Sequence, residues 1–277
     1  EGCTLDRFVA GWEVKLRNRE ELQHLRSRRV YGGDAVTLFD GSGTLATGTV
    51  DGWDTRWTEV EIGLERVWVV PHTRPWVGKA TVAVAMPRGR GRSDAVMEKL
   101  TELGVDEIVL VRAERSVAVP GKKKMRDVVD VDDDDEDAEE GRPVSGKWAR
   151  WRRMAVAACK QSMRARIPEI PRKAITVDEL AARLQRDAGH VAAYVASGRG
   201  QSLLHQTQYG SRQPRSSNFL LAVGPEGGFT AAEEASLVDS GATPVHLGQA
   251  RLRVDTAAVV GASILLLAME PRSQDET

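Results

Sequence analysis

The chain has 277 residues, of which 41% are hydrophobic and 29% are charged, and its net charge is −1. This length suits two modest domains, each with a core. The longest nearly apolar run, residues 254–269, contains Asp255 and other polar residues, which favours a buried helix and excludes a membrane span. Cys3 and Cys159 lie far apart and no Cys/His cluster is present, so we expect a reducing compartment and no metal site.

The net charge is nearly neutral because one acidic run offsets the positive charge of the rest of the chain. Nine of the eleven residues from 130 to 140 are Asp or Glu, and the rest of the chain carries +8. A basic body is typical of nucleic-acid-binding proteins, although a solvated acidic loop on an ordinary enzyme explains the charge equally well. The low complexity of residues 127–142 predicts disorder.

The first 72 residues predict a small β-rich domain. Val36 and Leu38, followed by Asp-Gly-Ser-Gly at 40–43, indicate a strand and a hairpin turn. Residues 47–50 and 60–64 predict further strands, and residues 20–29 predict a short helix or an extended basic stretch. Prolines at 71 and 75 indicate a linker.

From residue 76 the pattern predicts alternating strands and helices. The expected strands are 81–86, 107–111, 191–195, 219–223 and 244–247. Helices are expected at 93–104, 147–166, 178–186, 230–241 and 256–269. Ser93 is a plausible N-cap and Thr230 with Glu233 a capping box, while Gly104 and Gly241 end helices. The apolar side of the basic helix 147–166 comprises Trp148, Trp151, Ala155, Ala158 and Met163. This alternation predicts an α/β domain with a mainly parallel sheet.

Two glycine-containing segments follow predicted strands. The first is Gly-Pro-Glu-Gly-Gly-Phe at 224–229, and the second is residues 247–257. Glycines at strand ends let backbone atoms approach a ligand, and ligands bind beyond the carboxyl ends of strands in open α/β sheets. Two tight turns remain the alternative. The chain lacks a phosphate-binding loop and a nucleophile elbow, and the run at 89–94 lacks the third glycine of a dinucleotide fingerprint.

The two segments resemble the signature of the SPOUT methyltransferases, and more narrowly that of the ribosomal RNA small subunit methyltransferase E family. Residues 97–105 resemble the family's K-x-x-E-L-G-V helix, and residues 157–168 its A-x-x-Q-x-x-R-x-x-x-P segment. In the first domain, Arg7-Phe8, residues 24–34 and residues 39–41 resemble its RNA-binding domain. The resemblance covers nearly the whole chain outside residues 127–143.

The resemblance implies a fold and an activity. The fold is a PUA-like β-barrel domain at 1–72, followed by a SPOUT-type knotted parallel-sheet domain at 76–277 with an acidic insertion at about 127–143. The implied reaction transfers a methyl group from S-adenosylmethionine to N3 of a uridine in ribosomal RNA of the small subunit. A trefoil knot and a homodimer with its active site near the subunit interface are also implied.

Site residues follow from the matching segments. Arg253 is expected to stabilise the uracil oxygens or an anion, Asp255 to act as a base or to orient Arg253, and Glu226 to cap its loop or contact substrate. Helix-terminus charge is the alternative role for both acids. Expected cofactor contacts are Gly224, Gly227, Gly228, Leu247, Gly248, Leu252, Thr256 and Ala257. Expected RNA contacts are Arg7, Arg26, Arg28, Arg29, Gln161 and Arg164.

One departure from the family pattern keeps other functions open. The family's L-R-T-E-T-A reads Leu-Arg-Val-Asp-Thr-Ala at 252–257, so the carboxylate of Asp255 is one methylene shorter. A non-catalytic RNA-binding ribosome-assembly factor with the same fold is therefore an alternative, as is a SPOUT methyltransferase with another RNA target. The acidic insertion and the first residue, Glu1, favour an organelle-targeted form, in a chloroplast or mitochondrion, over a bacterial-type cytoplasmic enzyme.

Overall fold

The computed structural model describes residues 9–70, 78–116, 146–209 and 218–268. These residues form two compact units, one before residue 73 and one after it. The expected linker at 71–75, the acidic insertion and Arg7 lie outside the described residues.

Unit 1 is a four-stranded antiparallel sheet with one helix. Its elements are β1 (Glu13–Leu16), α1 (Arg19–Ser27), β2 (Ala35–Phe39), β3 (Thr44–Trp53) and β4 (Val60–Val69), and the strand order is β1-β4-β3-β2. The predicted strands and hairpin are confirmed, with longer strands than expected, and residues 20–29 are mainly helical. Sequence reasoning missed β1, which pairs with β4 from Glu13 to Leu16.

Unit 2 carries a six-stranded sheet in the order β10-β8-β9-β5-β6-β7, in which every pairing is parallel. Its strands are β5 (Ala80–Val84), β6 (Glu107–Arg112), β7 (Ile175–Thr176), β8 (Val191–Ser202), β9 (Asn218–Val223) and β10 (Thr243–His246). Its helices are α2 (Arg90–Leu103), α3 (Lys147–Ser162), α4 (Val177–Arg186), α5 (Leu203–Tyr209), α6 (Ala231–Asp239) and α7 (Val254–Ala268). The predicted parallel sheet is therefore confirmed.

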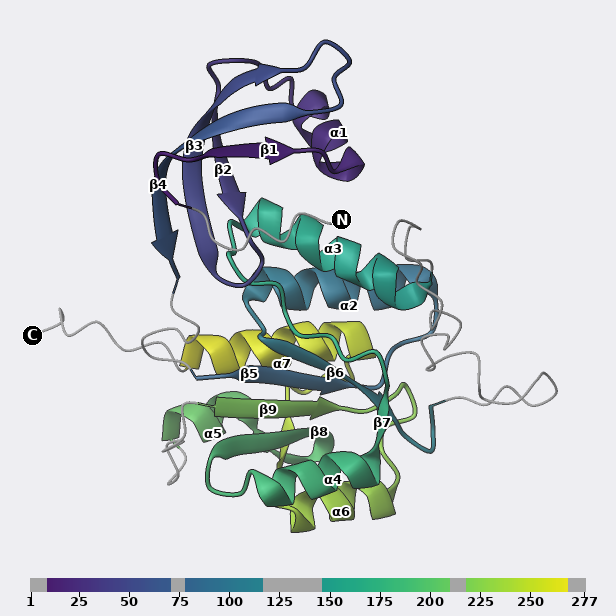
Figure 1. The fold of residues 1–277 in the computed structure, drawn as a ribbon. Helices are drawn as coiled ribbons and strands as arrows, with labels where there is room; N and C mark the ends of the chain where they lie inside the picture. Colours follow the sequence, from purple (N-terminus) through teal and green to yellow (C-terminus); the bar gives the residue numbers. More distant parts are fainter. Residues whose placement is uncertain (1–8, 71–77, 117–145, 210–217, 269–277) are drawn as a thin grey trace, which may run out of the picture. The chain divides into compact units, whose positions relative to one another are not determined.

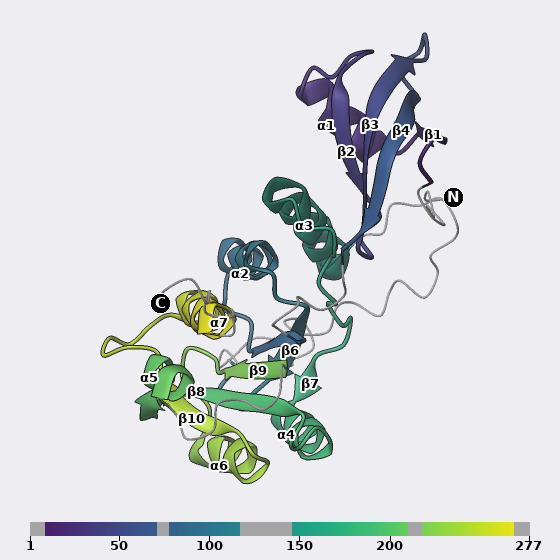
Figure 2. The ribbon, with the colours of Figure 1, turned by 90° about the vertical axis from the view of Figure 1, so that its left-hand side faces the viewer.

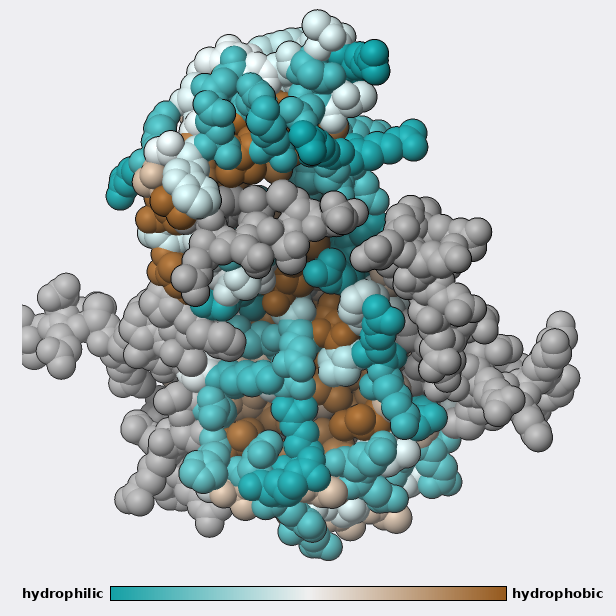
Figure 3. Space-filling view, in the orientation of Figure 1, coloured by the Kyte–Doolittle hydropathy of each residue, from teal (hydrophilic) through white to brown (hydrophobic). Residues whose placement is uncertain are grey.

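Helices cover both faces of this sheet (Figures 1 and 2). Val82 of β5 and Leu221 of β9 pack in one core with α2, α3, α5 and α7. The alternate residues Ala83 and Ala222 pack in a second core with α4 and α6. Side chains of successive strand residues point to opposite faces, which explains why β5 and β9 are apolar apart from Thr81 and Asn218. In Figure 3 the surface over α4 and α6 is mainly hydrophilic, with smaller hydrophobic areas between the polar side chains.

Helix α7 begins two residues earlier than predicted, at Val254, and the boundaries of α2 and α3 also differ from the prediction. Ser93 is not the N-cap of α2, because the helix begins at Arg90 and the Ser93 hydroxyl donates to the carbonyls of Gly89 and Arg90. Helix α3 ends at Ser162 and not at residue 166. Met163 follows it in the left-handed conformation, with φ of 56°, and is 66% exposed, so it does not belong to the apolar side of the helix.

Gly261 lets α7 lie close against β9. A Cβ atom at Gly261 would lie 2.5 Å from Cδ2 of Leu221 and 3.4 Å from Cδ2 of Leu247. We expect Gly261→Ala to lower the free energy of unfolding by about 1–3 kcal/mol, because overpacking a core forces side chains and backbone to shift. Gly91→Ala in α2 is the matched control, since a Cβ there meets nothing within 4 Å, and it should be neutral or stabilising. Urea unfolding measures both; equal stability of the two variants would contradict the close packing.

Among the described residues, every helix is too short or too polar to cross a membrane. The same residues contain no group of three His, Cys, Asp or Glu side chains that could hold a metal ion.

Candidate active site

Strands β5 and β9 end at the same edge of the sheet. They pair in parallel up to Val84 and Val223, and the Ala85 N–H donates to the Val223 carbonyl at 2.9 Å. The loop after β5 and the loop at 224–229 therefore leave the sheet side by side. This is the edge at which open α/β sheets bind ligands.

The 224–229 loop is a tight turn whose shape depends on glycine. A Cβ on the buried Gly224 would lie 2.9 Å from the backbone nitrogen of Phe229 and 3.1 Å from its ring. Gly228 has φ of 70°, and its N–H donates to the Pro225 carbonyl at 2.7 Å. The ring of Phe229 is anchored in the core beneath. The core thus holds the loop at Phe229, while Gly227 is exposed to solvent.

Two arginines from other loops hold this turn. Arg115, after β6, donates to the carbonyls of Gly227 and Phe229 at 3.0 and 3.4 Å, and its side chain lies against one side of Gly227. Arg251, after β10, donates to the Glu226 carbonyl at 2.7 Å. The Arg251 contact joins the two segments that the sequence singled out, 224–229 and 247–257.

The carboxylate of Glu226 faces the loop that follows β5. Its Oε1 atom accepts the N–H of Arg88 at 3.1 Å and lies 4.0 Å from the guanidinium of Arg92. The side chain is 36% exposed. Two roles were expected for Glu226, and these contacts support the one in which it fixes its loop. It is not a charge at the N-terminus of α6, because α6 begins five residues later, at Ala231.

The second segment lines the start of α7. Leu247 and Leu252 pack against the core, Gly248 is exposed with φ of 148°, and the Ala257 N–H donates to the Arg253 carbonyl at 2.7 Å. The side chains of Arg253 and Thr256 are exposed. The segment therefore presents the exposed side chain of Arg253 immediately before α7.

Two buried polar atoms border this segment without a hydrogen-bond partner among the described residues. They are Nδ1 of His246, at the end of β10, and Oδ1 of Asp255, in the first turn of α7. No hydrogen bond to Arg253 is present for Asp255 within the same residues. Buried polar atoms are normally paired, so this pair of atoms is suited to a bound ligand. The sequence had given no reason to single out His246.

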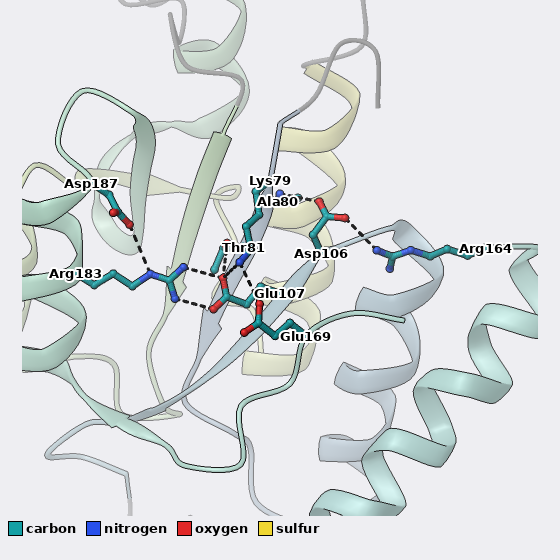
Figure 4. Close-up of polar contacts among 9 residues, drawn as sticks. All are labelled: Lys79, Ala80, Thr81, Asp106, Glu107, Arg164, Glu169, Arg183 and Asp187. Carbon is teal, nitrogen blue, oxygen red and sulfur yellow. Dashed lines mark hydrogen bonds and ion pairs between the residues drawn. The ribbon is translucent and has the colours of Figure 1, made fainter. Parts of the chain in front are cut away.

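Gln161 and Arg164 lie at the other end of unit 2. Arg164 donates to the Thr101 carbonyl at 3.0 Å and to Oδ1 of Asp106 at 3.2 Å, and its side chain is 13% exposed. Asp106 in turn accepts the Ala80 N–H at the start of β5 (Figure 4). The five residues of β5, about 17 Å at 3.3–3.4 Å each, separate this point from the 224–229 loop. Within one chain, then, Arg164 has a structural role and neither residue joins the site.

A basic cluster lies beside the site, and the sequence analysis had identified only the part of it that belongs to the basic helix at 147–166. Arg88 and Arg92 flank the start of α2, and Arg150, near the start of α3, pairs with Asp94. The pKa of Arg150 lies below its ordinary value because of desolvation first, and then because of the positive charges of Arg90 and Arg153. The alternating arginines and glycines at 88–92 were the available signal, which had been tested only as a dinucleotide motif.

The predicted RNA contacts of unit 1 are exposed. Arg26 lies in the last turn of α1, Arg28 caps the helix, and Arg29 follows with φ of 56°. All three are accessible to a polyanion, and their contact with RNA stays a prediction.

A known domain family matches most of unit 2. Residues 74–132 and 136–266 match the RNA methyltransferase domain. The ribosomal RNA small subunit methyltransferase E of Mycobacterium bovis is 31% identical over 237 residues, covering 84% of this chain and 78% of the relative.

Solved structures resemble the whole chain. A ribosomal RNA small subunit methyltransferase E from Neisseria gonorrhoeae, bound to S-adenosylmethionine, superimposes with a TM-score of 0.72 at 24% identity, covering 94% of each chain. A Legionella pneumophila methyltransferase with bound S-adenosylmethionine gives 0.70 at 25% identity, covering 95% of this chain and 94% of the other. These matches confirm the fold class predicted for the two domains.

Proposed function

Since the chain belongs to the ribosomal RNA small subunit methyltransferase E family, we propose that it transfers a methyl group from S-adenosylmethionine to N3 of a uridine in small-subunit ribosomal RNA. The observation that carries the proposal is the contact of the 224–229 and 247–257 segments through Arg251 and the Glu226 carbonyl. The second segment also contains the buried Oδ1 of Asp255, which has no hydrogen-bond partner among the described residues. The Legionella relative, solved with this cofactor, supports the cofactor assignment.

The residues at the site suit S-adenosylmethionine. A Cβ atom at Gly228 or Gly248 would meet nothing within 4 Å, so a ligand can lie directly against the backbone there. Leu247 and Leu252 offer apolar side chains for a purine, and Oδ1 of Asp255 is a buried acceptor to which no described residue donates. The residues that we assign to the cofactor are Gly224, Gly227, Gly228, Leu247, Gly248, Leu252, Thr256 and Ala257.

The cofactor supplies a methyl group on a sulfonium, which is transferred by direct displacement. The chain must align the acceptor and deal with the proton on N3 of uridine, which is weakly acidic. Arg253 stabilises the negative charge that develops on the uracil as this proton leaves. Asp255 either takes the proton or orients Arg253, and Glu226 fixes the loop. The family resemblance further implies that the protein acts as a homodimer, which light scattering of the purified chain will test.

Methyl transfer to unmodified small ribosomal subunits tests the proposal. The subunits are incubated with the protein and S-adenosylmethionine labelled in its methyl group, and the RNA is then digested to nucleosides. Label in N3-methyluridine is the expected result. Label in another nucleoside would support methyl transfer to RNA but contradict N3 of uridine as the acceptor. Cofactor binding without any label would favour a non-catalytic RNA-binding factor.

Asp255 provides a variant series for the same assay. We expect Asp255→Asn to lower the transfer rate about 100-fold or more, because the amide neither accepts a proton nor carries the charge that orients a guanidinium. Asp255→Glu, which restores the side chain of the family pattern, should retain activity. Calorimetric titration with S-adenosylmethionine checks that both variants bind the cofactor. Full activity of Asp255→Asn would remove this residue from the mechanism.

A further inference from the structure

Unit 1 contains an aromatic cavity that is lined by none of the residues assigned to methyl transfer. The cavity has a volume of about 320 Å³ and is lined by Arg26, Arg29, Val30, Tyr31 and Trp57. That volume lies at the lower end of the range for small-ligand sites, about 300–1,000 Å³. It suits a ligand no larger than one nucleotide.

Three aromatic rings stand together at this cavity. The centroids of Trp53 and Trp57 are 4.9 Å apart, and Tyr31 meets Trp57 edge-on with centroids 6.4 Å apart. The guanidinium of Arg26 lies over the ring of Trp53 at 5.6 Å. Tyr31 is 55% exposed and Trp57 is 40% exposed, which leaves aromatic surface open to an additional planar group.

The backbone fixes these rings in place. The indole N–H of Trp53 donates to the Val30 carbonyl at 3.1 Å, which ties the strand β3 to the segment after α1. Asp54 accepts the N–H groups of Thr58 and Glu59 at 2.5 and 2.7 Å, and this turn presents Trp57. Trp57 has φ of 58°, a conformation that is rare for a bulky residue. The cavity is therefore a preformed feature of the fold.

The charge at the cavity is positive. Arg26 and Arg29 line it, Arg28 lies between them in sequence, and no carboxylate is among the described residues that line it. Neither Arg26 nor Arg29 takes part in an ion pair with a described residue. A site with aromatic faces for stacking and guanidinium groups for an anion matches a nucleobase joined to a phosphate. Single-stranded nucleic acid is bound by such combinations of stacking and positive charge.

We propose that this cavity binds one unpaired nucleotide of the RNA substrate, with the base on Trp57 and Tyr31 and the phosphate on Arg26 and Arg29. The identification of the RNA as substrate rests on the proposed function, whereas the binding of an unpaired nucleotide does not. A base held within a duplex cannot present its face to the rings, so the cavity distinguishes single-stranded from double-stranded RNA.

Binding of short RNAs to the full chain tests the proposal. The probes are a fluorescent single-stranded oligonucleotide and a duplex of the same length. We expect Trp57→Ala to raise the Kd for the single strand about ten-fold, since stacking of one base contributes about 1–3 kcal/mol, and to leave the Kd for the duplex unchanged. Trp57→Phe should restore most of the affinity. Arg29→Ala should reduce the slope of log K against log salt by about 0.7, the value for one phosphate of a single strand.

Trp68→Ala is the matched control. Trp68 belongs to the same unit, is also 40% exposed and also lies beneath an arginine, Arg66, at 6.0 Å, but it does not line the cavity. This variant should bind both RNAs as the unaltered chain does. Equal weakening by Trp57→Ala and Trp68→Ala, or equal weakening for single strand and duplex, would overturn the proposal. An unchanged Kd in Trp57→Ala would do the same and would point to another kind of partner, such as a protein.

A methyl-transfer assay distinguishes failure of the proposed function from failure of the proposed nucleotide site. With small subunits as substrate, Trp57→Ala should raise KM and leave kcat near its original value, because the proposed role of the cavity is to bind RNA and none of its lining residues is assigned to the transfer step. If the unaltered chain transfers no methyl group, the proposed function fails, yet the oligonucleotide measurements still decide whether the cavity binds an unpaired nucleotide.

Discussion

Replacing Arg253 by alanine is expected to slow methyl transfer about 100-fold or more while leaving cofactor binding nearly unchanged. Its guanidinium is exposed immediately before α7, at the same helix terminus as Asp255. Loss of one group that stabilises a developing negative charge costs about 100- to 1,000-fold in other enzymes. The backbone should tolerate the change, because the contact of Arg253 with Ala257 uses its carbonyl.

Single-turnover transfer at saturating cofactor measures this effect without interference from product release. Arg186→Ala is the control, since it removes an exposed arginine of the same unit from α4, on the other face of the sheet. Arg253→Lys should fall between the two, because an ammonium keeps the charge but loses the planar fork of donors. A rate for Arg253→Ala equal to that of Arg186→Ala would exclude Arg253 from catalysis.

Glu107→Gln is expected to cause the largest loss of stability, about 3–5 kcal/mol. Glu107 starts β6, is 4% exposed, and accepts two hydrogen bonds from Arg183 at 2.8 and 2.7 Å (Figure 4). Lys79 lies 2.8 Å from the same carboxylate. Removing one partner of a buried ion pair leaves uncompensated charge, which accounts for the size of the loss.

Glu169→Gln is a control matched by a shared partner. Glu169 also pairs with Lys79, at 3.2 Å, but its side chain is 64% exposed. Exposed pairs contribute about 0–1 kcal/mol, so this variant should unfold in urea close to the unaltered chain. An equally small loss of stability in both glutamine variants would contradict the role of burial in the Glu107 ion pairs.

Acid titration gives an independent signature of Glu107. Burial alone would raise the pKa of its carboxyl group, but hydrogen bonds and charge from Arg183 and Lys79 outweigh burial and lower the pKa to about 2 from an ordinary value of 4.5. A depressed folded-state pKa stabilises the fold above the ordinary value, and this stabilisation is lost as pH falls from about 4.5 towards 2. The unfolding midpoint of Glu107→Gln should therefore depend less on pH in that range; parallel curves for the two proteins would contradict the assignment.

Strands and helices whose position depends on neighbouring residues could be predicted from the sequence. The apolar runs gave β5 and β9, and the capping box at Thr230 gave the start of α6. Helix α5 and the two-residue strand β7 were missed. The end of α3 was predicted too late. Helices often end at a glycine in the left-handed conformation, but here that conformation is adopted by Met163, which gives no such signal in the sequence.

Contacts between distant segments explain what the sequence could not show. The contact of Arg164 with RNA stays a prediction, whereas its hydrogen bonds to Asp106 and Thr101, about sixty residues earlier, were not predicted. Arg115 and Arg251 reach the 224–229 loop from other strand ends. The aromatic cavity joins residues 26–31 to Trp57 only after β3 has paired. Such partners depend on the register of strands that a linear pattern leaves undetermined.

Reverse transcription of treated small-subunit RNA tests the central claim most directly. A methyl group on N3 of uridine removes the N–H that pairs with adenine, so the polymerase stops at a modified position. Unmodified subunits incubated with the protein and S-adenosylmethionine should give a new stop at one uridine, and Arg253→Ala should give almost none. A stop at a different base, or a stop of equal strength with Arg253→Ala, would contradict the assignment of uridine N3 methylation to this site.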